Sequence, residues 1–165
     1  YRSSRGLGDV YKRQFDMCIN FENMEHIIDD RKLMKDVYEI LKPGGMLIFS
    51  APYYFLCPIS KSDEGPFSIE EDGGHVRRGY TRTMLEELSS EVGFEIEIIA
   101  GCSGFFSQKI TRIYRNIYTI HPLLAWMVIL PFRPLPPLLD PLCRKLFGVT
   151  DFSICMVASK PRFSK

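Results

Sequence analysis

The residues best suited to acid–base chemistry in this sequence are two histidines. His26 directly follows Glu25, and His75 opens a short stretch that also contains Arg77 and Tyr80. Because an imidazole titrates near neutral pH, His26 and His75 are candidate general bases. Arg77 offers a permanent cation for a carboxylate or phosphate, and Tyr80 offers an aromatic wall. Each group also has a structural alternative, in which His26 anchors its own loop and internal polar contacts hold the stretch around His75.

Apolar periodicity predicts the elements that must position these side chains. Strands are expected in four short, largely apolar runs, which are 15–21, 46–51, 94–100 and 151–159. Helices are expected from Asp29 or Asp30 to about Lys42, between Thr81 and Gly93, and over 105–118. The Pro-Gly-Gly run at 43–45 should end the first helix. Strands that alternate with helices in this way predict a parallel α/β sheet.

Composition narrows the class of protein. The 165 residues are 45% apolar and 25% charged, as in ordinary globular proteins, and the formal net charge is only +1. A chain without a basic excess gives no reason to expect a nucleic-acid partner. The five cysteines are scattered, odd in number and without a C-x-x-C pair, so we expect neither disulfides nor a metal site, and a cytoplasmic location. The longest apolar run has 11 residues, whereas a membrane-spanning helix needs about 20.

Several segments resemble class I S-adenosylmethionine-dependent methyltransferases. The pattern is a strand opening with Phe15-Asp16, a loop with Glu25-His26, and a helix that ends in Leu-Lys-Pro-Gly-Gly at 41–45 before the next strand. The stretches HVRRGYTRTMLEELSSEVGFEIE at 75–97 and CMVASKP at 155–161 resemble later parts of the same family. Gly79 departs from the pattern because it lengthens the spacing between His-x-Arg and Tyr-Thr.

The resemblance implies a fold and a set of site residues. It implies a partial Rossmann-like sheet, with strands 4, 5, 6 and 7 of the order 3-2-1-4-5-7-6 and with strand 7 antiparallel. It also implies S-adenosylmethionine as cofactor and a small-molecule methyl acceptor. The implied cofactor contacts are Asn20, Phe21, Glu22 and Glu25, and an ordinary turn at the strand end is the alternative. The implied acceptor contacts are Tyr53, Tyr54, Arg77 and Tyr80, beside the candidate bases His26 and His75.

The first fourteen residues differ from the rest. They have no strand or helix periodicity, and residues 4–14 (SRGLGDVYKRQ) resemble a translated sequencing adapter, whereas the alternative is a basic N-terminal arm. We therefore expect 1–14 to be an artefactual leader and 15–165 to be the C-terminal part of a methyltransferase domain. The glycine-rich loop and ribose-binding carboxylate of the family are not found, since no G-x-G follows a predicted strand. A fragment of this kind should be inactive, bind the cofactor weakly or not at all, and self-associate through the open strand 15–21.

A Pro- and Leu-rich insertion at 120–148 contains Trp126 and several cations. Its prolines should prevent one long helix. It could form a lid over a lipid-like acceptor, a peripheral contact with a membrane, or a helical hairpin packed on the sheet or on a second copy.

Two functions outside methyl transfer compete with this interpretation. The first is a non-catalytic Rossmann-like interaction module, which cofactor binding would separate from an enzyme. The second is a nucleotide-dependent oxidoreductase, against which the Lys-Pro-Gly-Gly element and the lack of a dinucleotide fingerprint both argue.

Overall fold

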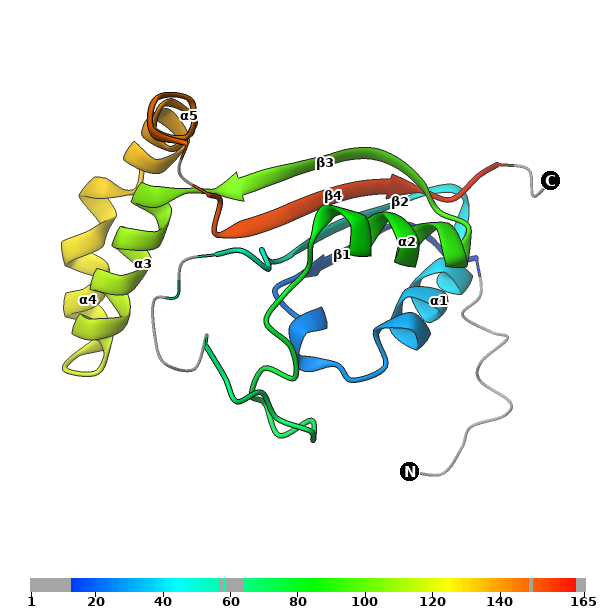
Figure 1. Cartoon of the computed structure of the whole chain (residues 1–165), viewed down its shortest axis with the longest axis horizontal. Helices are drawn as coiled ribbons and strands as arrows, with labels where there is room; N and C mark the ends of the chain where they lie inside the picture. Colours follow the sequence, from blue (N-terminus) through cyan, green and yellow to red (C-terminus); the bar gives the residue numbers. More distant parts are fainter. Residues whose placement is uncertain (1–12, 57, 59–63, 149, 163–165) are drawn as a thin grey trace.

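The computed structural model describes residues 13–56, 58, 64–148 and 150–162. In these residues four strands form one sheet in the order β1-β2-β4-β3 (Figure 1). The strands are β1 (Phe15–Phe21), β2 (Leu41–Pro52), β3 (Glu95–Ser103) and β4 (Ser153–Ser159). Strand β1 pairs with β2 in parallel, and β4 lies antiparallel to both β2 and β3. The predicted α/β class is therefore confirmed, whereas the sheet is mixed and not wholly parallel, because β4 runs against its neighbours. The carboxyl ends of β1, β2 and β3 lie at one edge.

Helices α1 (Asp30–Ile40) and α2 (Arg82–Val92) cover one face of the sheet (Figure 1). Their apolar stripes pack against alternate side chains of β2 and β4, which form the core. The largest fully buried residues of this core include Phe49, Leu47, Met156, Met34 and Leu85. The helix starts follow the predicted caps, since Asp29 accepts from Lys32 N at 2.9 Å and Thr81 accepts from Met84 N at 3.2 Å.

The other face of the sheet carries exposed apolar side chains. Leu47 and Phe49 belong to the core and pair in register with Cys18 and Asn20, so the intervening β1 residues point the opposite way. The side chains on this face are exposed, and they are Phe15, Met17, Ile19 and Phe21.

The Pro-Gly-Gly run behaves differently from its prediction. Helix α1 ends at Ile40, and β2 begins at Leu41 and runs through 43–45. The expected loop is instead part of the strand, because Leu41 pairs with Phe15 and the ladder shifts register before Met17. Gly45 leaves no room for a side chain there, since a Cβ would lie 2.9 Å from the Lys42 carbonyl oxygen.

Between β3 and β4 the chain forms a separate helical unit, visible beside the sheet in Figure 1. It consists of α3 (Phe105–Tyr118), α4 (Pro122–Ile129), the short turn η3 (Leu130–Phe132) and α5 (Leu135–Phe147). The predicted bounds of α3 are confirmed, and so is the break of the proline-rich insertion into short helices. No single described helix is long and apolar enough to cross a membrane, whereas Pro122–Phe132 and Leu135–Phe147 meet that test as a pair bent by 60°.

One buried carboxylate ties this unit together. Asp140 of α5 is buried, and its oxygens accept hydrogen bonds from Gly104 N at 2.9 Å and Phe106 N at 2.6 Å. Because Gly104 has no side chain to cap α3, Asp140 takes the place of an N-cap residue. The amide and hydroxyl of Ser107 also donate to Asp140.

The expectation that the cysteines form no disulfide is wrong. Cys102 and Cys155 are bonded across β3 and β4, although 53 positions separate them in the sequence. Cys155 pairs with Ala100, and the irregularity between Gly101 and Ser103 brings Cys102 beside it. The spacing of the cysteines along the sequence could not predict this disulfide, because only the pairing of β3 with β4 brings the two residues together. Cys18 and Cys143 are free thiols, and Cys57 lies outside the described residues.

Most of the predicted leader also lies outside the described residues. At its end, Arg13 N and Gln14 N donate to the carbonyl oxygens of Glu39 and Ile40. The division into a leader and a domain stays a prediction.

Candidate functional site

A cavity of about 430 Å³ opens at the edge where the parallel strands end. We call it the carboxyl-edge cavity. Strand ends supply one wall through Glu22, Pro52, Ser103 and Ser153. The turn η1 (Met24–His26) and helix α3 close it from two sides, and the remaining lining residues are Leu56, His75, Arg78, Ser107, Thr111, Arg115 and Phe152. Its volume falls in the range of small-molecule sites.

The structure brings both candidate bases into this cavity. The rings of His26 and His75 meet edge to face, with centroids 4.8 Å apart, although the two residues come from different loops. His26 Nδ1 donates to the Gly74 carbonyl oxygen at 2.9 Å. In that tautomer Nε2 keeps its lone pair, so the geometry leaves His26 able to accept a proton or bind a cation.

Glu25 lies beside the pair and is almost completely buried, with 2% of its surface exposed. One oxygen, Oε1, lies 3.8 Å from His26 Nε2, and the other has no hydrogen-bond partner. Burial raises the pKa of Glu25 to about 7, and the nearby charge of Glu22 acts in the same direction. The carboxyl group can therefore hold or release a proton near neutral pH.

Polar atoms without partners gather around this cavity. Among the described residues, the buried side-chain atoms that lack a hydrogen bond include Glu25 Oε2, Arg78 Nε and Ser103 Oγ, and all three residues line the cavity. Buried polar groups are nearly always hydrogen-bonded in proteins, so a cluster of exceptions marks a place where a ligand or water completes the bonding.

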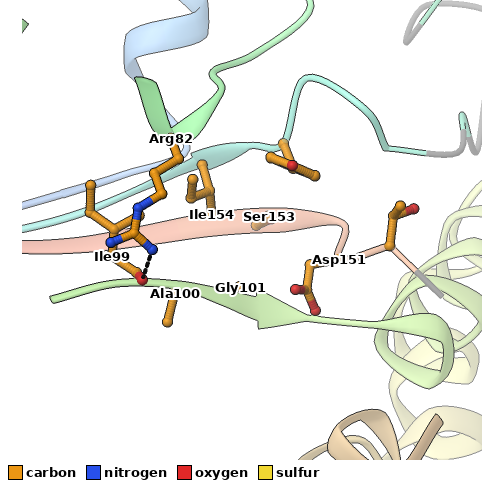
Figure 2. A pocket seen from close by; sticks show the side chains of 9 residues that line it. Arg82, Ile99, Ala100, Gly101, Asp151, Ser153 and Ile154 are labelled. Carbon is orange, nitrogen blue, oxygen red and sulfur yellow. Dashed lines mark hydrogen bonds between the residues drawn. The ribbon is translucent and has the colours of Figure 1, made fainter. Parts of the chain in front are cut away.

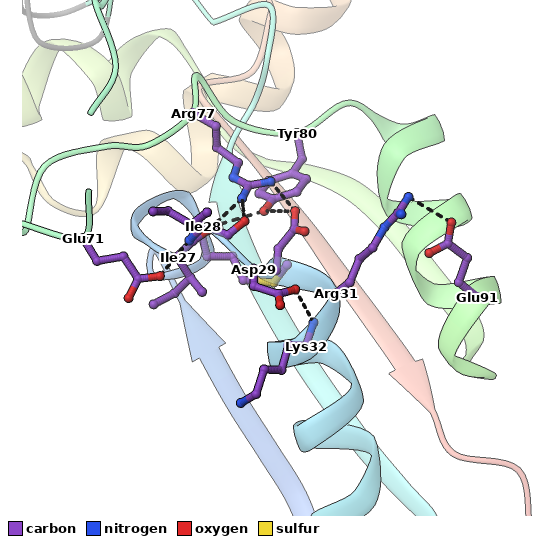
Figure 3. Close-up of polar contacts among 11 residues, drawn as sticks. Ile27, Ile28, Asp29, Arg31, Lys32, Glu71, Arg77, Tyr80 and Glu91 are labelled. Atoms are coloured by element: carbon purple, nitrogen blue, oxygen red, sulfur yellow. Dashed lines mark hydrogen bonds and ion pairs between the residues drawn. The ribbon is translucent and has the colours of Figure 1, made fainter. Parts of the chain in front are cut away.

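Arg77 and Tyr80, both predicted to contact the substrate, do not line the cavity. Arg77 forms an ion pair with Asp30 and donates to the carbonyl oxygens of Ile27 and Ile28, each at 2.7 Å. Figure 3 shows Arg77 and Tyr80 beside Ile27 and Ile28. Tyr80 is buried, and its hydroxyl donates to Asp30 at 2.9 Å. Burial and the Asp30 charge raise the pKa of Tyr80. Both residues therefore hold η1 and the start of α1 in place.

Gly79 explains how Tyr80 reaches that position. The glycine has a φ of +135°, and a Cβ on it would lie 2.2 Å from the Pro52 carbonyl oxygen. Only glycine fits so close to the end of β2. The close approach lets Tyr80 N donate to Pro52 O at 2.9 Å, which docks the long loop onto the sheet.

The two other residues predicted to contact the acceptor, Tyr53 and Tyr54, lie in different surroundings. Tyr54 stacks with Arg78, whose guanidinium carbon lies 5.8 Å from the ring centre. Tyr53 lines a second cavity of about 280 Å³ at the ends of β3 and β4, together with Arg82 and Asp151 (Figure 2). That second cavity contains no histidine, and we place the candidate site in the carboxyl-edge cavity.

Sequence reasoning missed Arg78 and the polar face of α3. The sequence His-Val-Arg-Arg does not indicate which arginine lines the cavity, because the path of the backbone around Gly79 determines which of the two side chains reaches it. Ser107, Thr111 and Arg115 were detectable, since a spacing of four residues puts them on one face of the predicted helix 105–118.

The residues predicted to contact the cofactor lie at the end of β1 and in the turn after it. Asn20 has a buried side-chain oxygen without a partner, which suits an ammonium donor such as that of a methionine moiety. Glu22 has a φ of +46°, and its carboxylate accepts from the Ser50 hydroxyl at 2.9 Å. Phe21 is exposed. These residues fit the methionine end of S-adenosylmethionine, whereas the described residues include no G-x-G turn after a strand for the rest of it.

The same cluster offers a donor set for a divalent ion. One ligand atom each of Glu25, His26 and His75 lies within 4.8 Å of the others. Imidazole and carboxylate groups are the ligands that zinc and related ions prefer.

Comparisons with known proteins agree with this fold. The sequence model of a family described as methyltransferase domain matches residues 7–49. A curated protein of Mycolicibacterium smegmatis, named "Probable S-adenosylmethionine-dependent methyltransferase", is 28% identical over 87 residues, which is 52% of this chain and 31% of that protein. The chain thus spans about a third of the length of this curated relative.

Solved structures resemble the chain over nearly its whole length. Phosphoethanolamine N-methyltransferase 2 of Haemonchus contortus, in complex with S-adenosyl-L-methionine, superposes with a TM-score of 0.54 at 18% identity, over 91% of this chain and 34% of that protein. The [4+2]-cyclase SpnF superposes with a TM-score of 0.52 at 16% identity, over 91% of this chain and 51% of that protein. At such identities the likeness shows the fold alone.

The sequence matches and the fold together confirm the resemblance drawn above. The chain is therefore similar to class I S-adenosylmethionine-dependent methyltransferases, over residues 7–49 in the family model and over 87 residues in the curated relative.

Proposed function

We propose that the protein transfers a methyl group from S-adenosylmethionine to a small molecule held in the carboxyl-edge cavity. The observation that carries this proposal is the meeting of an imidazole pair, a buried carboxyl group and unpartnered polar atoms at that edge. In open α/β sheets, ligands bind outside the carboxyl ends of the strands. Methyl transfer from a sulfonium needs alignment and sometimes a base, so this set of groups is sufficient.

The sheet order supports a position for each strand within the family fold. We assign β1, β2, β3 and β4 to strands 4, 5, 6 and 7 of the order 3-2-1-4-5-7-6. The supporting observations are the neighbour order β1-β2-β4-β3 and the antiparallel direction of β4. Asn20, Phe21, Glu22 and Glu25 would then lie on the cofactor side of the cavity, and α3 on the acceptor side.

The proposed roles follow from this placement. The cofactor supplies an electrophilic methyl group when bound. His26 or His75 accepts the proton that an acceptor hydroxyl or amine loses as its bond to the methyl carbon forms. Arg78 and Tyr54 take the acceptor-binding role predicted for the arginine and tyrosines, because Arg78 lines the cavity with an unpartnered Nε.

A labelling experiment tests the proposal. The protein is incubated with methyl-labelled S-adenosylmethionine and fractionated small molecules, and label transfer is measured for the wild type, His75→Asn and His121→Asn. His75→Asn should lose transfer, whereas His121→Asn should keep it, since His121 only caps α4 and asparagine is a good cap. Transfer by His75→Asn at the wild-type level would exclude His75 as the base, and the same result for His26→Asn would exclude the imidazole pair.

The competing non-catalytic module makes a different prediction for the same protein. It binds no S-adenosylmethionine and transfers no label. Fold alone does not decide between them, because one superposable structure is named as a cyclase. We also propose that this 165-residue chain on its own binds the cofactor weakly, because its described residues include no G-x-G turn after a strand. Calorimetric binding at micromolar concentration would contradict that.

Exposed apolar residues on β1 support a further proposal about the chain. We propose that it self-associates through the face formed by Phe15, Met17, Ile19 and Phe21, because exposed apolar strands pair with other chains. A cytoplasmic location also stays a proposal.

A further inference from the structure

The helical unit α3–α5 has a net positive charge, unlike the rest of the molecule. Residues 105–148 contain six basic side chains and one acidic one, which gives a formal charge of +5, whereas the whole chain is +1. The remaining residues therefore sum to −4. The single acid, Asp140, is buried and already bonded to the start of α3, so no exposed carboxylate lies within the unit. Among the cations, Arg144 forms an ion pair with Asp151, which lies just beyond the unit. The basic residues are Lys109, Arg112, Arg115, Arg133, Arg144 and Lys145.

The same unit exposes large apolar side chains. On α4, Leu123 and Met127 are 69% and 71% exposed. On α5, Leu138, Leu142 and Leu146 are all exposed, and their spacing of four residues puts them on one face. Large exposed apolar side chains together with cations are typical of an interaction site.

The shape of the unit distinguishes a membrane surface from other partners. Helix α4 has 8 residues and α5 has 13, and the two segments meet at 60°, so neither reaches across a bilayer. Apart from its buried Ala125 and Ile129, α4 presents apolar side chains to solvent without an intervening polar stripe. A protein groove takes one stripe of a helix, whereas a lipid interface accepts a short apolar helix flanked by cations.

We propose that α4 and α5 dock the protein on the surface of an anionic lipid membrane. The exposed leucines, Met127 and Phe147 enter the boundary between headgroups and acyl chains, and the cations contact lipid phosphates. Trp126 lies at this boundary, with the Arg133 guanidinium carbon 5.1 Å from the centre of its ring.

Docking would bring the candidate site to the membrane. Helix α3 packs on α4, and its Ser107, Thr111 and Arg115 line the carboxyl-edge cavity. If the proposed function holds, the acceptor is lipid-like and enters the cavity beside α3. This last step rests on the proposed function, whereas membrane docking does not.

Vesicle binding tests docking directly. The protein is mixed with vesicles of phosphatidylcholine alone or of equal parts phosphatidylcholine and phosphatidylglycerol, and bound protein is separated by flotation at low and high salt. We expect at least tenfold tighter binding to the anionic vesicles, weakened by salt because surface charges are screened. Trp126 is the only tryptophan, so a blue shift of its emission reports insertion of this unit alone.

Variants identify the surface. Leu123→Ser with Met127→Ser should abolish binding and the blue shift, whereas Ile69→Ser, at a still more exposed apolar residue outside the unit, should change neither. Arg133→Glu with Lys145→Glu should remove the preference for anionic lipid. The proposal would be overturned if the Leu123/Met127 variant bound vesicles as tightly as the wild type. It would also be overturned if the emission of Trp126 shifted to the blue without vesicles, through formation of a dimer. Label transfer to a water-soluble acceptor is measured for the same Leu123/Met127 variant. If this transfer is unchanged while vesicle binding is lost, docking and the proposed function are independent of each other.

Discussion

The half of the molecule formed by the sheet with α1 and α2 differs sharply from the helical unit α3–α5. The first half encloses a continuous core, whereas the second buries only Ala125, Ile129 and Asp140. The sheet half is thus stabilised mainly by apolar burial, and the helical unit is positioned by a carboxylate at the start of α3. A unit attached in this way can carry a surface for a partner without weakening the fold that holds the site.

The largest expected effect compares two phenylalanines, one from each half. Phe49 is completely buried in the core, whereas Phe147 at the end of α5 is 74% exposed. Phe49→Ala should lower the free energy of unfolding by about 3–5 kcal/mol, because it leaves a cavity. Phe147→Ala should change it by less than about 0.5 kcal/mol. Chemical denaturation of both variants checks this, and equal losses would mean that the helical unit has a core of its own.

A second prediction concerns the carboxylate that positions the helical unit. Asp140→Ala leaves the amides of Gly104 and Phe106 without an acceptor, and it should cost roughly 2–3 kcal/mol. Asp140→Asn keeps one acceptor oxygen and should lose less. Hydrogen exchange should rise at the start of α3 and stay unchanged in α1. Uniform destabilisation of both helices would contradict a local role.

The third prediction uses the pKa of Glu25. Its value of about 7 in the folded protein lies above the ordinary value of 4.5, so the folded state holds the proton more tightly than the unfolded state. Stability should therefore fall as pH rises from about 4.5 to 7, by on the order of 2 kcal/mol. Glu25→Gln removes this titration and should flatten the slope. Thermal unfolding across this pH range, in the presence of a chelator, makes the measurement, and identical slopes would show that Glu25 titrates normally.

The smallest effect on stability is expected at the open face of β1. Ile19→Lys places a charge on an exposed side chain, so it should change the free energy of unfolding by less than about 0.5 kcal/mol. The same change should shift the protein toward monomer, since charged edge strands resist pairing. Light scattering after size exclusion measures the mass, with Ile69→Lys as the matched control. If the Ile19→Lys variant kept the same oligomeric mass, the self-association would have to involve another surface.

Local signals predicted much of the sheet half. Asp29 and Thr81 cap their helices as expected, and Gly93 ends α2 with a φ of +97°. Such features depend on a few neighbouring residues, so they can be found without a fold. The placement of His26 and His75 at one site was not predictable in detail, since the loop at 52–79 had no periodicity to locate it.

By itself, the sequence determined the resemblance to class I methyltransferases, the succession of strands and helices along the chain, and the choice of His26 and His75 as candidate bases. Only the tertiary structure decided which polar side chains line the carboxyl-edge cavity and which hold neighbouring segments in place. It assigned Arg77 to Asp30 and left Arg78 at the cavity, because the glycine between β2 and Tyr80 sets the course of the backbone. It also joined Cys102 to Cys155 and placed Asp140 at the start of α3, since strand pairing and helix packing bring together residues that are far apart along the chain.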